Sequence, residues 1–211
     1  MRKHKSKIIA LIVILAALTG SWLLGGVPEI NTPSSPINVV ASEGEDIQIF
    51  GTDHAYARTP VEPEDMHITD EYFYVTLSVR VDMILYNMHL LHKDQHELIP
   101  EDGVIFPETS VRAYVGESVF NVLQREMRRH RIHMSSRWTP IFNSAYVEAI
   151  NNLYEFDVGP LSGWMYNVNG WFPNFGASRY LLSPGDVIEW MYTVDLGRDL
   201  GVHWLAEDLY E

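Results

Sequence analysis

The chain has 211 residues, in which 28 acidic side chains outnumber 15 basic ones and give a formal net charge of -13 at pH 7. A surface this acidic disfavours nucleic acid and anionic lipid as partners, because both are negatively charged themselves. The chain has no cysteine, which excludes disulfides, thiolate metal ligands, a cysteine nucleophile and a lipid-bearing cysteine.

Residues 1–27 are typical of a membrane-targeting segment. The first seven, MRKHKSK, are basic, and the following twenty carry no charge. A twenty-residue helix is about 30 Å long, enough to cross a bilayer, and the basic flank predicts that the rest of the chain lies outside the cell. The small residues Thr19, Gly20 and Ser21 could form a cleavage site. We expect either a single-pass signal anchor in the cell membrane or a signal peptide whose cleavage releases a secreted product.

Residues 28–71 are rich in acidic side chains and proline and contain few bulky apolar residues. This composition is typical of an extended spacer whose charges repel one another. Two short apolar runs, INVV at 37–40 and IQIF at 47–50, could nevertheless form strands. At the other end of the chain, residues 202–211 form an acidic tail.

A folded domain is expected over residues 72–201. Apolar and polar residues alternate over 72–85 and again over 108–115, which predicts two strands. The polar segment 87–103 between them reads as a long loop. Beyond Gly116 the apolar period becomes that of a helix of about three turns, with Ser118 as its N-cap. One face of that helix carries Val119, Val122, Leu123, Glu126 and Met127.

Several short strands should follow the helix. The segments 132–138, 144–150, 153–158 and 187–194 are strand-like, and turn residues separate them. Asn169-Gly170 lies between two aromatic strand ends, which is a strong hairpin signal. Two strands, a helix and further strands predict an α+β domain, in which a β-grasp-like mixed sheet wraps one helix and is preceded by the N-terminal transmembrane or signal helix.

Four long sequence segments occur in the chain in the order GESVFNVLQREM, IFNSAYVEAINNLYEFD, GPLSGWMYNVNGWFPNFG and PGDVIEWMYTVDLGRDLG. In these segments and their order, the chain from about residue 72 to 201 resembles the bacterial transcobalamin-like C-terminal domain family. The resemblance implies a β-grasp fold of the soluble-ligand-binding type and makes a corrinoid a possible ligand. It also implies cysteines at four positions where this chain has Val81, Val158, Ala177 and Val194. Within these 211 residues we expect no counterpart of the helical barrel that covers the other corrinoid face in the vertebrate carriers.

The uncharged aromatic stretch after Asn169-Gly170 is the candidate binding surface. Strand alternation places Trp164 and Tyr166 on one face, which favours a structural role for these rings. The rings that follow are interrupted by proline and asparagine and cannot all turn inward from a loop. We therefore expect an exposed aromatic loop that contacts a ligand or partner. The candidate ligand-binding residues are Trp171, Phe172, Asn174, Phe175 and Tyr180.

Other residue patterns favour plainer roles. The spacing of His89, His92 and His96 would suit zinc on a helix, but the polar surroundings favour a solvated loop. Asp195 and Asp199 could approach calcium but lack the ligand density of a calcium loop. The basic cluster around the end of the helix is typical of a helix terminus, although it could also contact an anion or the chain's own acidic spacer. Its members are Arg125, Arg128, Arg129, Arg131 and Arg137.

The sequence predicts a protein that is not an enzyme. It contains no nucleophile elbow, no zinc-protease motif and no phosphate-binding loop. Glu155 and Asp157 share a strand face, but no acid or base partner accompanies them. We expect an extracytoplasmic, membrane-anchored binding module for a small ligand such as cobalamin, with no required cofactor or metal. The alternative is a cell-surface structural module that binds another protein.

Overall fold

The computed structural model describes residues 58–202. The expected membrane segment, the runs INVV and IQIF, and all of the acidic tail except its first residue lie outside this range. Within residues 58–202, no helix combines the length and the apolar character that crossing a bilayer requires.

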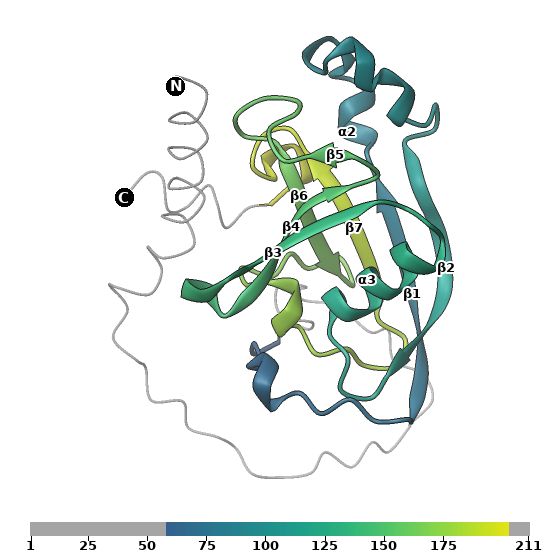
Figure 1. Cartoon of the computed structure of the whole chain (residues 1–211), viewed down its shortest axis with the longest axis vertical. Helices are drawn as coiled ribbons and strands as arrows, with labels where there is room; N and C mark the ends of the chain where they lie inside the picture. The colour runs from purple at the N-terminus through teal and green to yellow at the C-terminus, as the bar shows by residue number, and fades with distance from the viewer. Residues whose placement is uncertain (1–57, 203–211) are drawn as a thin grey trace, which may run out of the picture.

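Two β-sheets and one principal helix form the domain (Figure 1). The four-stranded sheet has the order β2-β1-β7-β6 and the three-stranded sheet has the order β3-β4-β5. The mixed α+β class expected from the sequence is confirmed. The strands are β1 (Tyr72–Arg80), β2 (Val104–Tyr114), β3 (Met134–Thr139), β4 (Ser144–Ile150), β5 (Leu153–Tyr154), β6 (Gly163–Val168) and β7 (Val187–Thr193), and the helices are α2 (Asp82–Leu85) and α3 (Val119–Arg129).

The centre of the four-stranded sheet is a parallel pair, β1 and β7, with an antiparallel strand on each side. Alternation along β1 buries Val75, Leu77 and Val79, as its sequence predicts. The strand ends at Arg80, earlier than the alternation suggested, because the chain turns there into the short helix α2. The expected loop 87–103 contains two 3₁₀ helices, Met88–Leu90 and Lys93–Leu98.

Helix α3 agrees closely with its prediction. The Ser118 side chain accepts a hydrogen bond from the backbone N–H of Asn121, and the Asn121 side chain accepts one from the backbone N–H of Ser118. This reciprocal capping satisfies two donors that a helix N-terminus otherwise leaves unpaired. All five side chains of the predicted face are buried. The helix therefore joins the core through the face that its sequence specifies.

The prediction of one mixed sheet wrapping the helix is only partly right, since β3, β4 and β5 form a sheet of their own. Asn151 and Asn152 adopt positive φ angles and make a tight turn between β4 and β5. Phe156 also has a positive φ, and the chain leaves the second sheet after only two residues of β5. It then returns to the first sheet as β6, which leaves β4 facing β6 across the domain.

Residues 58–71, which the sequence assigned to the spacer, lie against the domain. The Val61 N–H donates to the Arg179 carbonyl at 2.9 Å, and the Thr69 N–H donates to the Val115 carbonyl at 3.0 Å. The Arg58 guanidinium also pairs with Asp186 at 3.2 Å. These contacts join at least residues 58–71 to the domain that was expected to begin at residue 72.

The four positions where the resemblance implies cysteine are filled by packed apolar side chains. Val81, Val158 and Ala177 are buried, and Val194 is partly buried against the same core. Their packing contributes to the core by burial of apolar surface, which requires no disulfide.

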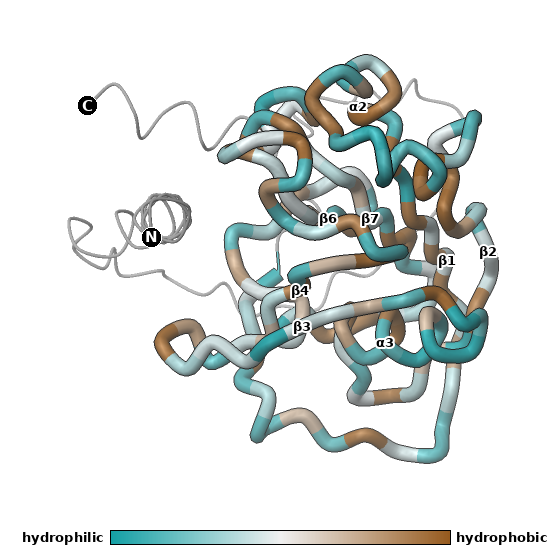
Figure 2. Tube along the Cα trace, turned by 45° about the horizontal axis from the view of Figure 1, so that its top comes forward, coloured by the Kyte–Doolittle hydropathy of each residue, from teal (hydrophilic) through white to brown (hydrophobic). Residues whose placement is uncertain are grey.

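The hairpin formed by β3 and β4 extends away from the body of the domain, and its tip is apolar (Figure 2). Ile141 at the tip is 71% exposed, and Trp138 on β3 is 50% exposed. Large apolar side chains at this exposure lie outside the core and are available to a contacting molecule.

Candidate functional site

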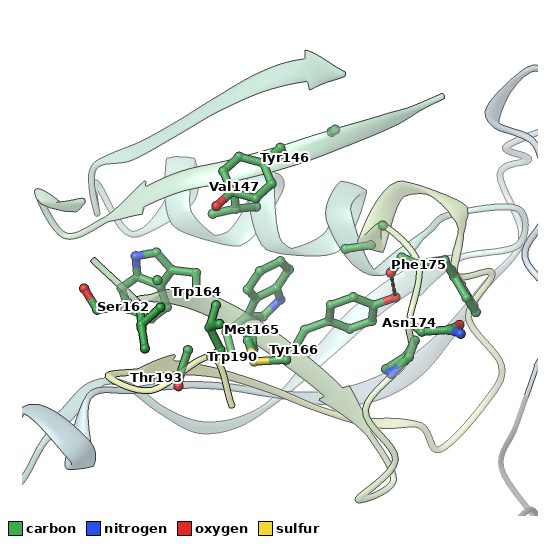
Figure 3. Close-up of a pocket in the computed structure, with 17 residues that line it drawn as sticks. Tyr146, Val147, Ser162, Trp164, Met165, Tyr166, Asn174, Phe175, Trp190 and Thr193 are labelled. Atoms are coloured by element: carbon green, nitrogen blue, oxygen red, sulfur yellow. Dashed lines mark hydrogen bonds between the residues drawn. The ribbon is translucent and has the colours of Figure 1, made fainter. Parts of the chain in front are cut away.

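A pocket of about 190 Å³ lies between β4 of the second sheet and β6 of the first (Figure 3). Trp164, Met165 and Tyr166 of β6 line it together with Trp190 of β7. Val147 and its neighbours on β4 form the opposite wall, and the loop 173–177 closes one end. The pocket thus occupies the space between the two sheets, where their facing side chains do not meet.

Strand register explains why large rings line the wall on β6 and β7. Trp164 pairs with Tyr192 and Tyr166 pairs with Trp190 across the two strands. Directly opposite residues on antiparallel strands project from the same face, so their rings contact one another. The ring centroids of Tyr166 and Trp190 are 5.4 Å apart, and those of Trp164 and Tyr192 are 5.2 Å apart.

Two hydrogen bonds fix the rings of β6 in place. The indole Nε1 of Trp164 donates to the Leu153 carbonyl at 2.9 Å. The Tyr166 hydroxyl donates to the Phe175 carbonyl at 2.9 Å, which ties the closing loop to β6 (Figure 3). A pocket whose wall is held in this way is formed before any ligand arrives, which lowers the entropic cost of binding.

The chemistry of the pocket is apolar and uncharged. None of its lining residues carries a charged side chain, and its surface is mainly apolar. Such a surface favours an uncharged apolar group, because a charge moved there would lose its hydration without gaining a partner. The indole Nε1 of Trp190 is buried and has no hydrogen-bond partner among the described residues. The arrangement can hold a flat apolar group, but it supplies no charged side chain for acid or base catalysis.

The tyrosines around the pocket are phenols that stay neutral at physiological pH. Burial raises the pKa of the Tyr166 hydroxyl well above its usual value. Burial likewise raises the pKa of Tyr192, and it raises the pKa of Tyr146, whose hydroxyl also donates to the Glu155 carboxylate. A phenol that ionises only at strongly alkaline pH does not serve as a base at neutral pH.

The structure separates the five predicted ligand-binding residues. Asn174 and Phe175 line the pocket, whereas Trp171, Phe172 and Tyr180 do not. The expectation that the rings of residues 171–175 stand open to solvent needs correction, because these rings are half-buried. The hairpin that turns at Asn169-Gly170 contains a single pair, Val168 with Trp171, and the chain then folds back over the core.

Tyr180 lies beneath this loop. Its side chain is completely buried, and its ring stacks on Phe175 at 6.1 Å and contacts Trp171 at 6.3 Å. A ring in this position supports the loop from the core side and offers no surface to a ligand. The part that the other predicted residues play in binding stays a prediction.

Trp164, Tyr166 and Trp190 line the pocket, although alternation assigned the first two to the core and singled out no role for the third. Alternation shows that such residues point inward, but it cannot show that the facing sheet leaves a space there. The one sequence signal for the pocket was the large number of aromatic residues in two segments, 163–168 and 187–193, which form the paired strands β6 and β7.

The histidines and aspartates considered as metal ligands make hydrogen bonds within their own segments. His92 Nδ1 accepts from the Asp94 N–H at 3.3 Å, and His96 Nε2 is 3.2 Å from the Leu91 carbonyl. Over residues 58–202, no group of three potential metal ligands comes together. Asp199 accepts hydrogen bonds from the Thr193 side chain and the Val194 N–H, which occupies the carboxylate that might have faced calcium.

The carboxylates of Glu155 and Asp157 also serve the fold. Glu155 accepts from the Tyr146 hydroxyl. Asp157 accepts from the Gln95 side chain at 2.7 Å and from the Tyr154 N–H at 2.8 Å. Both acids hold neighbouring segments together, and they do not form a pair.

Replacing Tyr180 by Phe should leave the free energy of unfolding at pH 7 unchanged or higher, because the buried hydroxyl has no hydrogen-bond partner among the described residues. Burial raises the pKa of this hydroxyl to about 12 from 10.0. The unfolded chain therefore loses the proton first, and the stabilisation present below pH 10 is lost as the pH rises through 12.

Urea unfolding of both proteins between pH 7 and pH 12 checks this expectation. The free energy of unfolding of the Phe variant should fall less steeply above pH 10 than that of the wild type. Equal slopes would mean that the Tyr180 hydroxyl ionises alike in the folded and unfolded chains.

Comparison with known proteins gives one family match. Residues 116–194 match the model of a domain of unknown function, DUF4430. The matched segment runs from the start of α3 to the end of β7 and includes both walls of the pocket. No curated protein matches the chain.

Two solved structures show low similarity. Haptocorrin in complex with Cbi is 18% identical, with a TM-score of 0.44, over 61% of this chain and 26% of the haptocorrin chain. A protein from Ruminococcus gnavus, described as a candidate metal-binding protein, is 15% identical, with a TM-score of 0.34, over 57% of this chain and 96% of that one. This chain thus spans about a quarter of the haptocorrin chain, and at these TM-scores neither structure establishes a shared function.

Proposed function

We propose that the chain is a non-enzymatic binding module that inserts one ring-sized apolar group of its ligand into the pocket between β4 and β6. The observation that carries this proposal is an uncharged pocket of about 190 Å³ whose wall is built from Trp164, Tyr166 and Trp190. A cavity of about 150 Å³ lined by apolar side chains is large enough to bind benzene. Aromatic rings also offer an entering ring both area and favourable edge-to-face contacts.

The proposed module acts outside the cell and is held at the membrane by residues 1–27. Support for this placement comes from the basic start of the chain and the uncharged run that follows it. The acidic, proline-containing residues before Arg58 would then separate the domain from the bilayer. Detection of the full-length chain in the membrane fraction, accessible to protease added outside intact cells, tests this placement.

A corrinoid is the small-molecule candidate that the resemblance to the transcobalamin-like β-grasp domains favours. The pocket restricts how it could bind, since sites that enclose a drug-sized ligand usually have about 300–1,000 Å³. A corrinoid would therefore place one peripheral group in the pocket, with its macrocycle outside, near the exposed residue Asn174.

Calorimetric titration of the full chain in detergent with p-cresol and with cyanocobalamin tests the proposal. We expect p-cresol to bind with a dissociation constant of about 1 mM or lower, as roughly 0.5 kcal/mol per heavy atom would give. Absence of p-cresol binding contradicts the proposed function. If p-cresol binds and cyanocobalamin neither binds nor competes, only the corrinoid candidate is wrong.

A further inference from the structure

Strand β3 is an open edge of the three-stranded sheet. It pairs with β4 on one side only. The Asn151 N–H donates to the His133 carbonyl at 2.8 Å, which shows that the main chain of His133 points toward β4. These directions alternate along a strand, and the register shift between Ser135 and Ser136 skips one residue of β4 and none of β3. The N–H and carbonyl groups of the next residue after His133, and of every second one after it, therefore point outward. The residues with outward main-chain groups are Met134, Ser136 and Trp138.

The outward groups of β3 are accessible and unprotected. Ser136, Arg137 and Trp138 are all exposed, and within residues 58–202 no strand or loop supplies hydrogen bonds to this edge. Proteins usually blunt such an edge with proline, lysine or a bulge, because unpaired main-chain groups attract other strands. In the four-stranded sheet, the edge strand β2 contains Pro107 and pairs with β1 in irregular register, and five of the six residues of the edge strand β6 are buried. β3 contains neither proline nor lysine, and the extra residue of its irregular pairing with β4, Glu148, lies on β4.

The start of β3 is basic on a chain that is otherwise acidic. Arg128, Arg129 and Arg131 are exposed at the end of α3 and in the connection to β3. Arg128 and Arg131 make no ion pair with any described residue, and Arg129 approaches the Glu126 carboxylate only at 3.8 Å. An acidic segment placed along β3 would therefore find unpaired positive charge at one end.

The opposite end of β3 offers an apolar contact. Trp138 is 50% exposed, and cross-strand pairs between an aromatic ring and a β-branched side chain are favourable. We propose that the open edge of β3 binds an extended acidic segment of a partner polypeptide as an added strand, with an apolar residue of that segment against Trp138. Main-chain hydrogen bonds supply affinity in this mode of recognition, and the arginines and the indole supply selectivity. This surface is separate from the pocket, since no residue of β3 lines it.

Amide hydrogen exchange of the full chain in detergent tests the proposal with two synthetic hexapeptides, the acidic EIEVEI and the basic KIKVKI. We expect the acidic peptide to slow exchange at Ser136 and Trp138, and the basic peptide to leave it unchanged. Added salt should weaken the acidic peptide's binding, because exposed charges are screened. Unchanged exchange with the acidic peptide, or equal protection by both peptides, would overturn the proposal.

Two variants at one position locate the contact. Ser136→Pro removes an outward N–H without removing a bond to β4, and it should weaken acidic-peptide binding about tenfold. Ser136→Ala keeps that N–H, so its affinity should stay within about twofold of the wild type. Binding of p-cresol should be the same in both variants, which shows that the domain is folded. Equal peptide affinity of the two variants would contradict strand addition at β3.

Slow exchange of the Ser136 and Trp138 amides in the absence of any peptide would show that another segment already occupies the β3 edge. If protection disappears on deletion of residues 43–50, the chain's own acidic spacer occupies the edge. If it disappears on dilution, a second copy occupies it. Either result overturns the proposal of a separate partner.

Discussion

Replacing Ala145 by Phe should lower the affinity for p-cresol at least about tenfold, while the protein stays folded. Ala145 lines the pocket from β4 and is two residues from Val147, so strand alternation gives both side chains the same direction. The added phenyl ring is close in size to the group that the pocket is proposed to accept, and it would occupy the same space. Calorimetric titration and thermal unfolding of the variant measure the two effects separately.

The matched control places a ring of the same size outside the pocket. Ile141 is 71% exposed at the tip of the β3–β4 hairpin and does not line the pocket. Ile141→Phe should therefore bind p-cresol as the wild type does. If Ala145→Phe keeps wild-type affinity, p-cresol binds elsewhere and the pocket is not the site.

Replacing Gly116 by Ala should lower the free energy of unfolding by about 3 kcal/mol or more. Gly116 has a φ of +92°, and a Cβ atom there would lie 2.1 Å from the carbonyl oxygen of His67. The clashing atom belongs to the backbone of the segment that precedes β1, so that segment must move away from the domain. Urea unfolding monitored by circular dichroism measures the loss.

Gly185 provides the control for backbone strain alone. It has a φ of +82°, but a Cβ atom at this position would meet no other atom within 4 Å. Gly185→Ala should therefore cost only about 1 kcal/mol. Equal losses in the two variants would mean that the close approach of His67 to Gly116 contributes nothing to stability.

Local sequence signals predict the parts of the fold that local interactions determine. Helix α3 follows from its apolar period and from Ser118 at its start, and the turns at Asn151-Asn152 and Asn169-Gly170 follow from residues that tolerate positive φ. Burial along β1 follows from alternation. In each case the information lies within a few neighbouring residues.

Signals of this kind do not show how separate segments meet. The pocket exists because β4 and β6 belong to different sheets, and no local pattern reports the space between them. For the same reason the aromatic loop was expected in solvent, although Trp171 and Phe175 pack against Tyr180. Composition likewise suggested a free spacer up to residue 71, whereas hydrogen bonds such as that from Val61 to Arg179 hold its last part on the domain.

The most direct test is to follow the indole N–H signals of the ¹⁵N-labelled full chain by nuclear magnetic resonance during titration with p-cresol. Trp164 and Trp190 line the pocket, whereas Trp138 lies on the exposed edge strand β3. We expect the Trp164 and Trp190 signals to shift and saturate together while the Trp138 signal stays in place. A titration in which neither pocket signal moves, or in which only the Trp138 signal moves, would contradict a ring-binding pocket between the two sheets.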